Sequence, residues 1–138
     1  MPPTAHHFAV TVTDLDRAVA FYRDTLGLDV LNEFTVGGDA FATGVGINGA
    51  SAEFVHLATG DARIELVEYD PVGETAAETE LNQPGATHLG LEVDDLDTVF
   101  DSLPEGCETI AEPQTTESGT RILFVRDPDG TLVELLET

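Results

Sequence analysis

Four side chains at matching places in two similar stretches of the sequence could bind one metal ion. His7 and His88 each open an apolar stretch, and Glu65 and Glu134 each stand inside another. A carboxylate buried among apolar residues is costly without a partner, and a cation relieves that cost. Two imidazoles and two carboxylates suit a divalent ion of zinc, nickel, cobalt, manganese or iron. The pattern predicts one such site, the alternative being that all four side chains line the solvent faces of strands.

These four residues belong to an internal repeat. Residues 7–16 recur as residues 88–97, which is a shift of 81 positions, and residues 64–68 recur as residues 133–137, a shift of 69. Two related units can pack side by side around a shared cleft, where equivalent positions face one another. The repeat therefore predicts that His7, Glu65, His88 and Glu134 converge.

The periodicity within each unit predicts a strand, a helix and three further strands. The first helix is expected to begin at Leu15 after a capping Thr13 or Asp14 and to end at Gly27. A hairpin turn is expected at residues 59–61 and another at residues 127–130. The expected strands are residues 7–12, 29–34, 53–58, 63–69, 88–93, 109–111, 121–126 and 131–136, with the second helix at residues 96–103.

We therefore predict an α+β fold of two tandem βαβββ units that form a curved mixed sheet around a metal-binding cleft. A chain of 138 residues has the size of one domain. Within it we expect a first unit at residues 5–70, a linker at residues 71–85 and a second unit at residues 86–138. Residues 35–52 are rich in glycine and alanine and show no clear pattern.

The charge of the chain excludes several classes of partner. There are 27 acidic residues against five arginines and no lysine, which gives a formal net charge of −22. Binding to nucleic acid or to an anionic membrane needs clustered positive charge, which this composition lacks. Such self-repulsion weakens a compact fold unless salt screens it. We therefore hypothesise a halophilic protein that needs high salt.

Compartment and redox chemistry follow from two further features. No apolar run approaches the roughly 20 residues of a membrane helix, and the N-terminus does not have the composition of a leader peptide. We therefore expect a cytoplasmic protein.

Cys107 is the one cysteine, and Glu105 and Glu108 beside it should raise its pKa. We expect it to be structural and not a nucleophile.

Two other histidines lie near the predicted ligands in sequence or in the expected hairpin. His6 precedes His7, and alternation along a strand would turn it to the opposite face. His56 lies across the expected hairpin from the region of Glu65. We expect both to be surface residues, with a polar role beside the site as the alternative for His56.

The sequence resembles the vicinal oxygen chelate superfamily, which includes glyoxalase I, methylmalonyl-CoA epimerase, extradiol dioxygenases, fosfomycin resistance enzymes and bleomycin resistance proteins. The resemblance spans nearly the whole chain, and the stretches that carry it are residues 7–17, 20–28, 63–66, 87–94 and 124–135. It implies that the family's metal positions fall on His7, Glu65, His88 and Glu134. A complete set of four is similar to that of glyoxalase I and the epimerase.

This resemblance implies a divalent-metal-dependent isomerase or lyase of the glyoxalase I type, either lactoylglutathione-lyase-like or epimerase-like. In such enzymes a carboxylate moves the proton next to a metal-bound carbonyl, a role that falls on Glu134 and on Glu65. The expected partners are a small-molecule substrate and a second copy of the chain. The alternatives are a small-molecule binding or antibiotic-resistance protein, with or without metal, and an extradiol dioxygenase.

Overall fold

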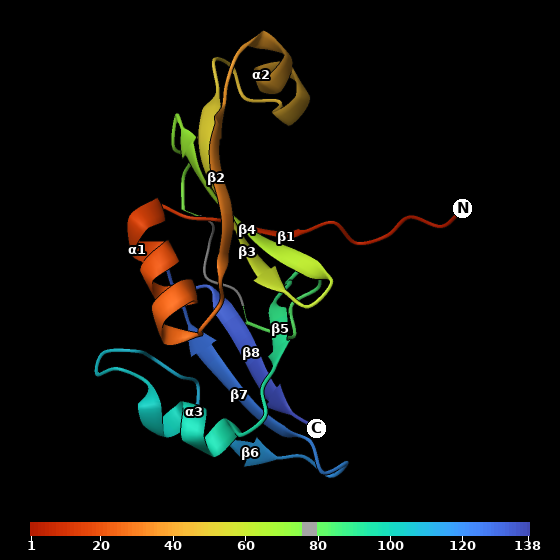
Figure 1. The fold of residues 1–138 in the computed structure, drawn as a ribbon, viewed down its shortest axis with the longest axis vertical. Coiled ribbons are helices and arrows are strands. Elements are labelled where there is room, and N and C mark those ends of the chain that lie inside the picture. The colour runs from red at the N-terminus through yellow and green to blue at the C-terminus, as the bar shows by residue number, and fades with distance from the viewer. Residues whose placement is uncertain (76–79) are drawn as a thin grey trace. The chain divides into compact units, whose positions relative to one another are not determined.

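The computed structural model describes residues 1–75 and 80–138, which form two compact units (Figure 1). The units comprise Met1–Ala76 and Ala77–Thr138, and each holds one four-stranded mixed sheet. The α+β class and the two βαβββ-like units are thus confirmed. Part of the linker expected at residues 71–85, namely residues 76–79, lies outside the described residues. Over residues 1–75 and 80–138, no helix is long and apolar enough to span a membrane.

The sheet of the first unit has the strand order β1-β4-β3-β2, with β1 parallel to β4 and the other neighbours antiparallel. The helix expected from Leu15 begins there and continues into a wider π-helical turn, in which Leu26 N donates to Phe21 O. Gly27, with a φ of 82°, ends it as expected. The elements are β1 (Phe8–Thr11), α1 (Leu15–Val19), η1 (Ala20–Thr25), β2 (Val30–Val36), α2 (Asp39–Val45), β3 (Ser51–Thr59) and β4 (Ala62–Asp70).

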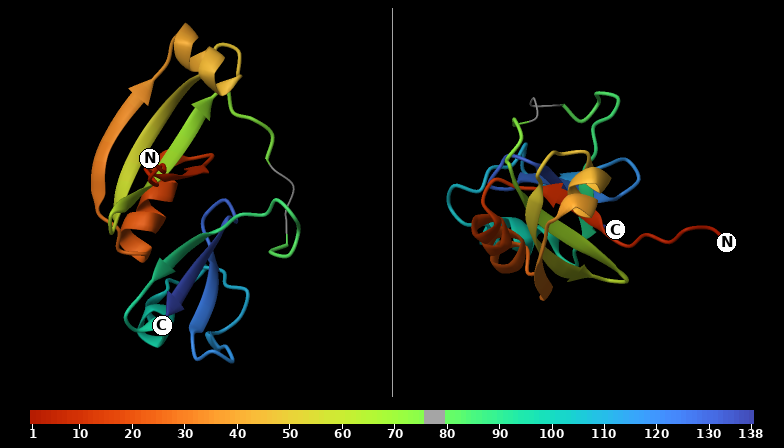
Figure 2. Two further views of the ribbon diagram at one scale, coloured as in Figure 1. Left: turned by 90° about the vertical axis from the view of Figure 1, so that its right-hand side faces the viewer. Right: turned by 90° about the horizontal axis from the view of Figure 1, so that it is seen from above.

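Helix α2 occupies part of residues 35–52, where the sequence showed no clear pattern. It lies at one end of the first unit's sheet, between the end of β2 and the start of β3 (Figure 2). Phe41 from this helix contacts the rings of Phe54 and Tyr69. The helix therefore covers the end of the sheet face on which these aromatic side chains gather.

The sheet of the second unit repeats this order as β5-β8-β7-β6. One expectation was wrong: residues 109–111 do not form a strand, because Thr109 makes only an isolated bridge to Val125. Pro113 has no N–H to continue the ladder, and pairing resumes in the two residues after it. The elements are β5 (Leu89–Glu92), α3 (Leu96–Ser102), β6 (Gln114–Thr115), β7 (Arg121–Arg126) and β8 (Leu132–Glu137).

Alternation along β4 gives the first sheet two different faces. Ile64 and Leu66 are fully buried, and Glu68 further along the same face accepts a hydrogen bond from the N-terminus of α1. This face therefore packs against the helix. Glu65 points to the opposite face, so the strand that builds the core also presents a carboxylate away from it.

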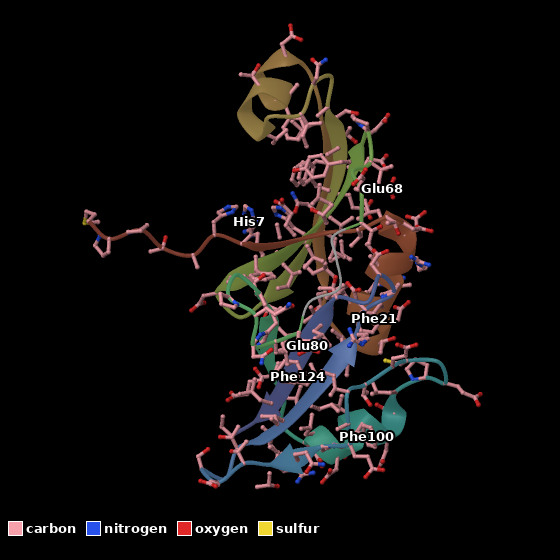
Figure 3. The ribbon with its side chains drawn as sticks, turned by 180° about the vertical axis from the view of Figure 1, so that it is seen from behind. His7, Phe21, Glu68, Glu80, Phe100 and Phe124 are labelled. Atoms are coloured by element: carbon pink, nitrogen blue, oxygen red, sulfur yellow. The ribbon has the colours of Figure 1, made fainter. Side chains whose placement is uncertain are left out.

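The repeated acidic residues Glu68 and Glu137 bind the first backbone amide of the helix in their own unit. Glu68 Oε1 lies 2.8 Å from Leu15 N, and Glu137 Oε1 lies 2.8 Å from Leu96 N. Figure 3 shows Glu68 on β4 next to α1. Each helix also has an aspartate at its N-cap. These carboxylates satisfy amides at the positive end of the helix.

We expect Glu68→Ala and Glu137→Ala each to lower the free energy of unfolding by about 1–3 kcal/mol, because each leaves a helix amide without its charged acceptor. Urea denaturation measures the change. Glu53→Ala, at an exposed position on β3, is the matched control and should stay within about 0.5 kcal/mol. Equal midpoints for the control and the two variants would contradict the capping role.

Candidate metal-binding site

In the first unit, His7 and Glu65 come together across the parallel strands β1 and β4. Ala9 is the register partner of Glu65, and His7 stands two residues earlier on the segment leading into β1 (Figure 3). His7 Nε2 lies 3.6 Å from Glu65 Oε2, and the two side chains are 36% and 12% exposed.

In the second unit, His88 on the segment leading into β5 and Glu134 on β8 form the equivalent pair. Gly90 is the register partner of Glu134, again two residues after the histidine. A Cβ atom at Gly90 would lie 3.8 Å from Glu134 Oε1, an ordinary van der Waals contact, so an alanine such as Ala9 would also fit there. His88 Nε2 lies 3.2 Å from Glu134 Oε1, and the side chains are 36% and 21% exposed. The repeat in sequence is thus also a repeat in geometry.

Each unit by itself supplies one imidazole nitrogen and one carboxylate oxygen, and both are partly accessible to solvent. These donor types fit part of the coordination shell of a divalent transition metal. Within the described part of the chain, no three His, Cys, Asp or Glu side chains are grouped so as to hold a metal ion. The four-ligand site made of His7, Glu65, His88 and Glu134 therefore stays a prediction.

His56 is buried beside Glu65, so the expectation of an exposed side chain was wrong. It is 5% exposed, and its Nε2 lies 2.8 Å from Glu65 Oε2. The register explains why: Gly60 and Asp61 form a two-residue turn, Thr59 therefore pairs with Ala62, and His56 pairs with Glu65. Directly opposed residues of an antiparallel pair share a face. The sequence alone left this register open.

His6 is also placed differently from the expectation. The residue is exposed, as expected, but its Nδ1 lies 2.8 Å from Nδ1 of His7, and its ring centroid lies 6.3 Å from that of His56. Alternation does not apply here, since β1 begins only at Phe8. Three histidines and one glutamate of the first unit therefore lie close together.

Cys107 has the electrostatic setting that the sequence predicted for an unreactive thiol. Burial raises the pKa of the Cys107 thiol above its usual value, and the negative charge of Glu108 raises it further. The thiolate, which is the nucleophilic form, is disfavoured by both causes. The candidate site within the described residues therefore consists of the His–Glu pairs and not of Cys107.

Comparisons with known proteins identify the family of the chain. The sequence model of the Glyoxalase/Bleomycin resistance protein/Dioxygenase superfamily matches residues 4–135. A probable lactoylglutathione lyase from Synechocystis is 29% identical, covering 96% of this chain and 93% of the relative. The mitochondrial methylmalonyl-CoA epimerase of Mus musculus is 30% identical, covering 94% of this chain and 70% of the relative. Other relatives of similar identity are uncharacterized proteins.

Among solved structures, a glyoxalase family protein from Bacillus cereus superposes with a TM-score of 0.82. It is 25% identical and covers 96% of this chain and 91% of its own. The sequence match and the structural match both span nearly the whole chain. Both therefore include the strands that carry the His–Glu pairs.

Proposed function

The chain belongs to the Glyoxalase/Bleomycin resistance protein/Dioxygenase superfamily, and on this premise we propose that it is a divalent-metal-dependent lyase or isomerase of the glyoxalase I type. The observation that carries the proposal is the His–Glu pair repeated in the two units, at 3.6 Å and 3.2 Å. A binding protein that works without metal has no need of two equivalent sets of metal donors. The resemblance to a probable lactoylglutathione lyase and to an epimerase supports the same class of reaction.

In this proposal His7, Glu65, His88 and Glu134 hold one divalent ion. A bound ion of this kind polarises a carbonyl oxygen and makes the neighbouring C–H more acidic. Glu134 accepts the proton and returns it at the adjacent carbon, and Glu65 is the second carboxylate able to do so. A carboxylate that is partly exposed and bonded to one imidazole is accessible to a substrate and able to exchange a proton.

The substrate we propose is a small carbonyl compound or its thiol adduct. The chain has five arginines, of which Arg23 pairs with Asp24 and Arg121 pairs with Asp97. With a net charge of −22, a coenzyme A thioester would bring its phosphates to a strongly negative protein. An adduct of methylglyoxal with a small thiol requires less positive charge. We therefore favour the lyase over an epimerase that acts on coenzyme A esters.

The remaining parts of the proposal concern the setting of the protein. We propose a single vicinal oxygen chelate domain with units at residues 5–70 and 86–138, which works as a homodimer in the cytoplasm of a halophile. The charge and the absence of basic clusters in the sequence support a small molecule as the partner, with neither nucleic acid nor membrane.

The test is turnover by metal-stripped protein before and after one equivalent of Ni²⁺, Co²⁺, Mn²⁺, Fe²⁺ or Zn²⁺ is added. With methylglyoxal and a small thiol in deuterated water, we expect product to form only in the reconstituted protein, with deuterium exchange at the carbon next to the carbonyl. Glu53→Gln, which removes one exposed charge outside the site, serves as the active control. Tight ligand binding without turnover or exchange would favour the binding protein, and ring cleavage of a catechol with Fe²⁺ would favour the dioxygenase.

A further inference from the structure

His56 is held between a cation and the carboxylate that we propose as a metal ligand. Its Nδ1 lies 3.3 Å from Nη1 of Arg63, and its Nε2 lies 2.8 Å from Oε2 of Glu65. All three residues stand on the hairpin of β3 and β4. The imidazole is 5% exposed, so water does not compete freely for either nitrogen. Both of its nitrogens therefore have protein partners.

The chemistry of the partners determines which nitrogen carries the proton. A guanidinium only donates hydrogen bonds, so Nδ1 of His56 must accept from Arg63. The hydrogen then resides on Nε2, which donates to Oε2 of Glu65. A carboxylate accepts such a hydrogen bond, and its charge strengthens it. Arg63 thus selects the tautomer in which His56 can hold Glu65.

The second unit lacks this arrangement, although it repeats the rest of the geometry. The position opposite Glu134 on β7 is Phe124, just as His56 is opposite Glu65 on β3. Phe124 contacts the ring of His88 at 5.1 Å between centroids and has no group that could bind a carboxylate. The two equivalent glutamates therefore differ: Glu65 has a buried hydrogen-bond donor on its neighbouring strand, whereas Glu134 faces an aromatic ring there.

We propose that His56, fixed in its Nε2–H tautomer by Arg63, is a positioning residue that holds Glu65 in place as a metal ligand. The proposal rests on the metal-dependent function proposed above. Glu65 Oε2 receives the hydrogen bond, while Oε1 has no hydrogen-bond partner within residues 1–75 and 80–138 and remains available to an ion. Without His56 the carboxylate would have to be ordered when the metal binds, which lowers affinity.

Two measurements test this proposal, and the first needs no metal. In metal-free protein at about pH 8.5, above the usual imidazole pKa of about 6.5, proton–nitrogen NMR identifies the protonated ring nitrogen. We expect Nε2–H for His56, and a loss of this preference in Arg63→Met. An Nδ1–H tautomer in the wild-type protein would overturn the proposal.

The second measurement is the dissociation constant for Ni²⁺, determined by calorimetry. His56→Phe copies the residue found opposite Glu134, and we expect it to bind Ni²⁺ about 10- to 100-fold more weakly. His56→Gln should recover most of this loss, because its amide can donate to Glu65 and accept from Arg63. Glu53→Gln, at an exposed position on β3, is the control and should bind Ni²⁺ as tightly as the wild-type protein.

The outcomes separate this inference from the proposed function. Wild-type Ni²⁺ affinity in His56→Phe, or no recovery in His56→Gln, would overturn the positioning role even if the wild-type protein is an active lyase. Conversely, a wild-type protein without turnover refutes the proposed function, while the tautomer and the Ni²⁺ affinities still decide the role of His56. If His56→Phe does not fold, the Ni²⁺ affinity of the Gln variant and the NMR measurement decide that role instead.

Discussion

Glu134→Gln is expected to lower the turnover of the metal-reconstituted protein by a factor of about 10²–10⁴, the usual contribution of a positioned acid–base group. The amide has the size of the carboxylate and can still accept a hydrogen bond from His88, but it does not take up a proton at neutral pH. The loss should therefore come from kcat. Binding of the metal should also weaken, because a charged donor is replaced by a neutral one.

Glu137→Gln is the matched control for this variant. It removes one charge in the same way, three residues further along β8. Glu137 lies outside the proposed site, because its carboxylate accepts a hydrogen bond from the N-terminus of α3. Glu137→Gln should keep the turnover and the metal binding of the wild-type protein. Far-ultraviolet circular dichroism of both variants establishes that the fold is intact. Wild-type turnover in folded Glu134→Gln would rule out a role for this carboxylate in proton transfer.

Salt is expected to stabilise the protein strongly. With a net charge of −22 and no lysine, repulsion between carboxylates acts against the folded state at low ionic strength. Raising the salt to about 1 M shortens the Debye length to about 3 Å and removes most of this repulsion. If screening recovers about 3 kcal/mol, the midpoint of thermal unfolding should rise by about 10 °C for a chain of this size.

The measurement is a series of thermal melts in KCl from dilute buffer to molar concentration, followed by circular dichroism. Sucrose is the control, since it favours compact states without screening charge. A midpoint that is unchanged by KCl contradicts the idea that the acidic surface limits stability. It would also remove the support for a halophilic origin, which is based on the charge alone.

The sequence predicted most of the elements because their local signals agree. Leu15 begins a helix after Asp14, whose side chain accepts from Arg17 N, and Gly27 ends it with a positive φ. The strand at residues 121–126 lies where it was expected. Capping residues, turn glycines and alternation are properties of short segments, so they can be read without knowledge of the partner strand.

Other features of the fold depend on how distant segments pair, and this pairing cannot be read from a short segment alone. Thr109 was expected to begin a strand, but after one bridge the ladder stops near Pro113. Helix α2 gave no clear pattern, because it buries no side chain fully and packs mainly through Phe41. A slip of one residue in an antiparallel register reverses the face of every side chain. The sequence left the register of this hairpin open, so it did not show that His56 shares a face with Glu65.

The sequence by itself determined the duplication, the residue types of the two His–Glu pairs and the acidic surface, since these are properties of composition and spacing. Only the tertiary structure decided what lies beside each glutamate. The two-residue turn sets His56 against Glu65, while the equivalent hairpin sets Phe124 against Glu134. Cross-strand neighbours are chosen by register, which arises when strands pair. The sequence thus shows that the two units are alike, whereas only the strand pairing shows that their glutamates have different neighbours.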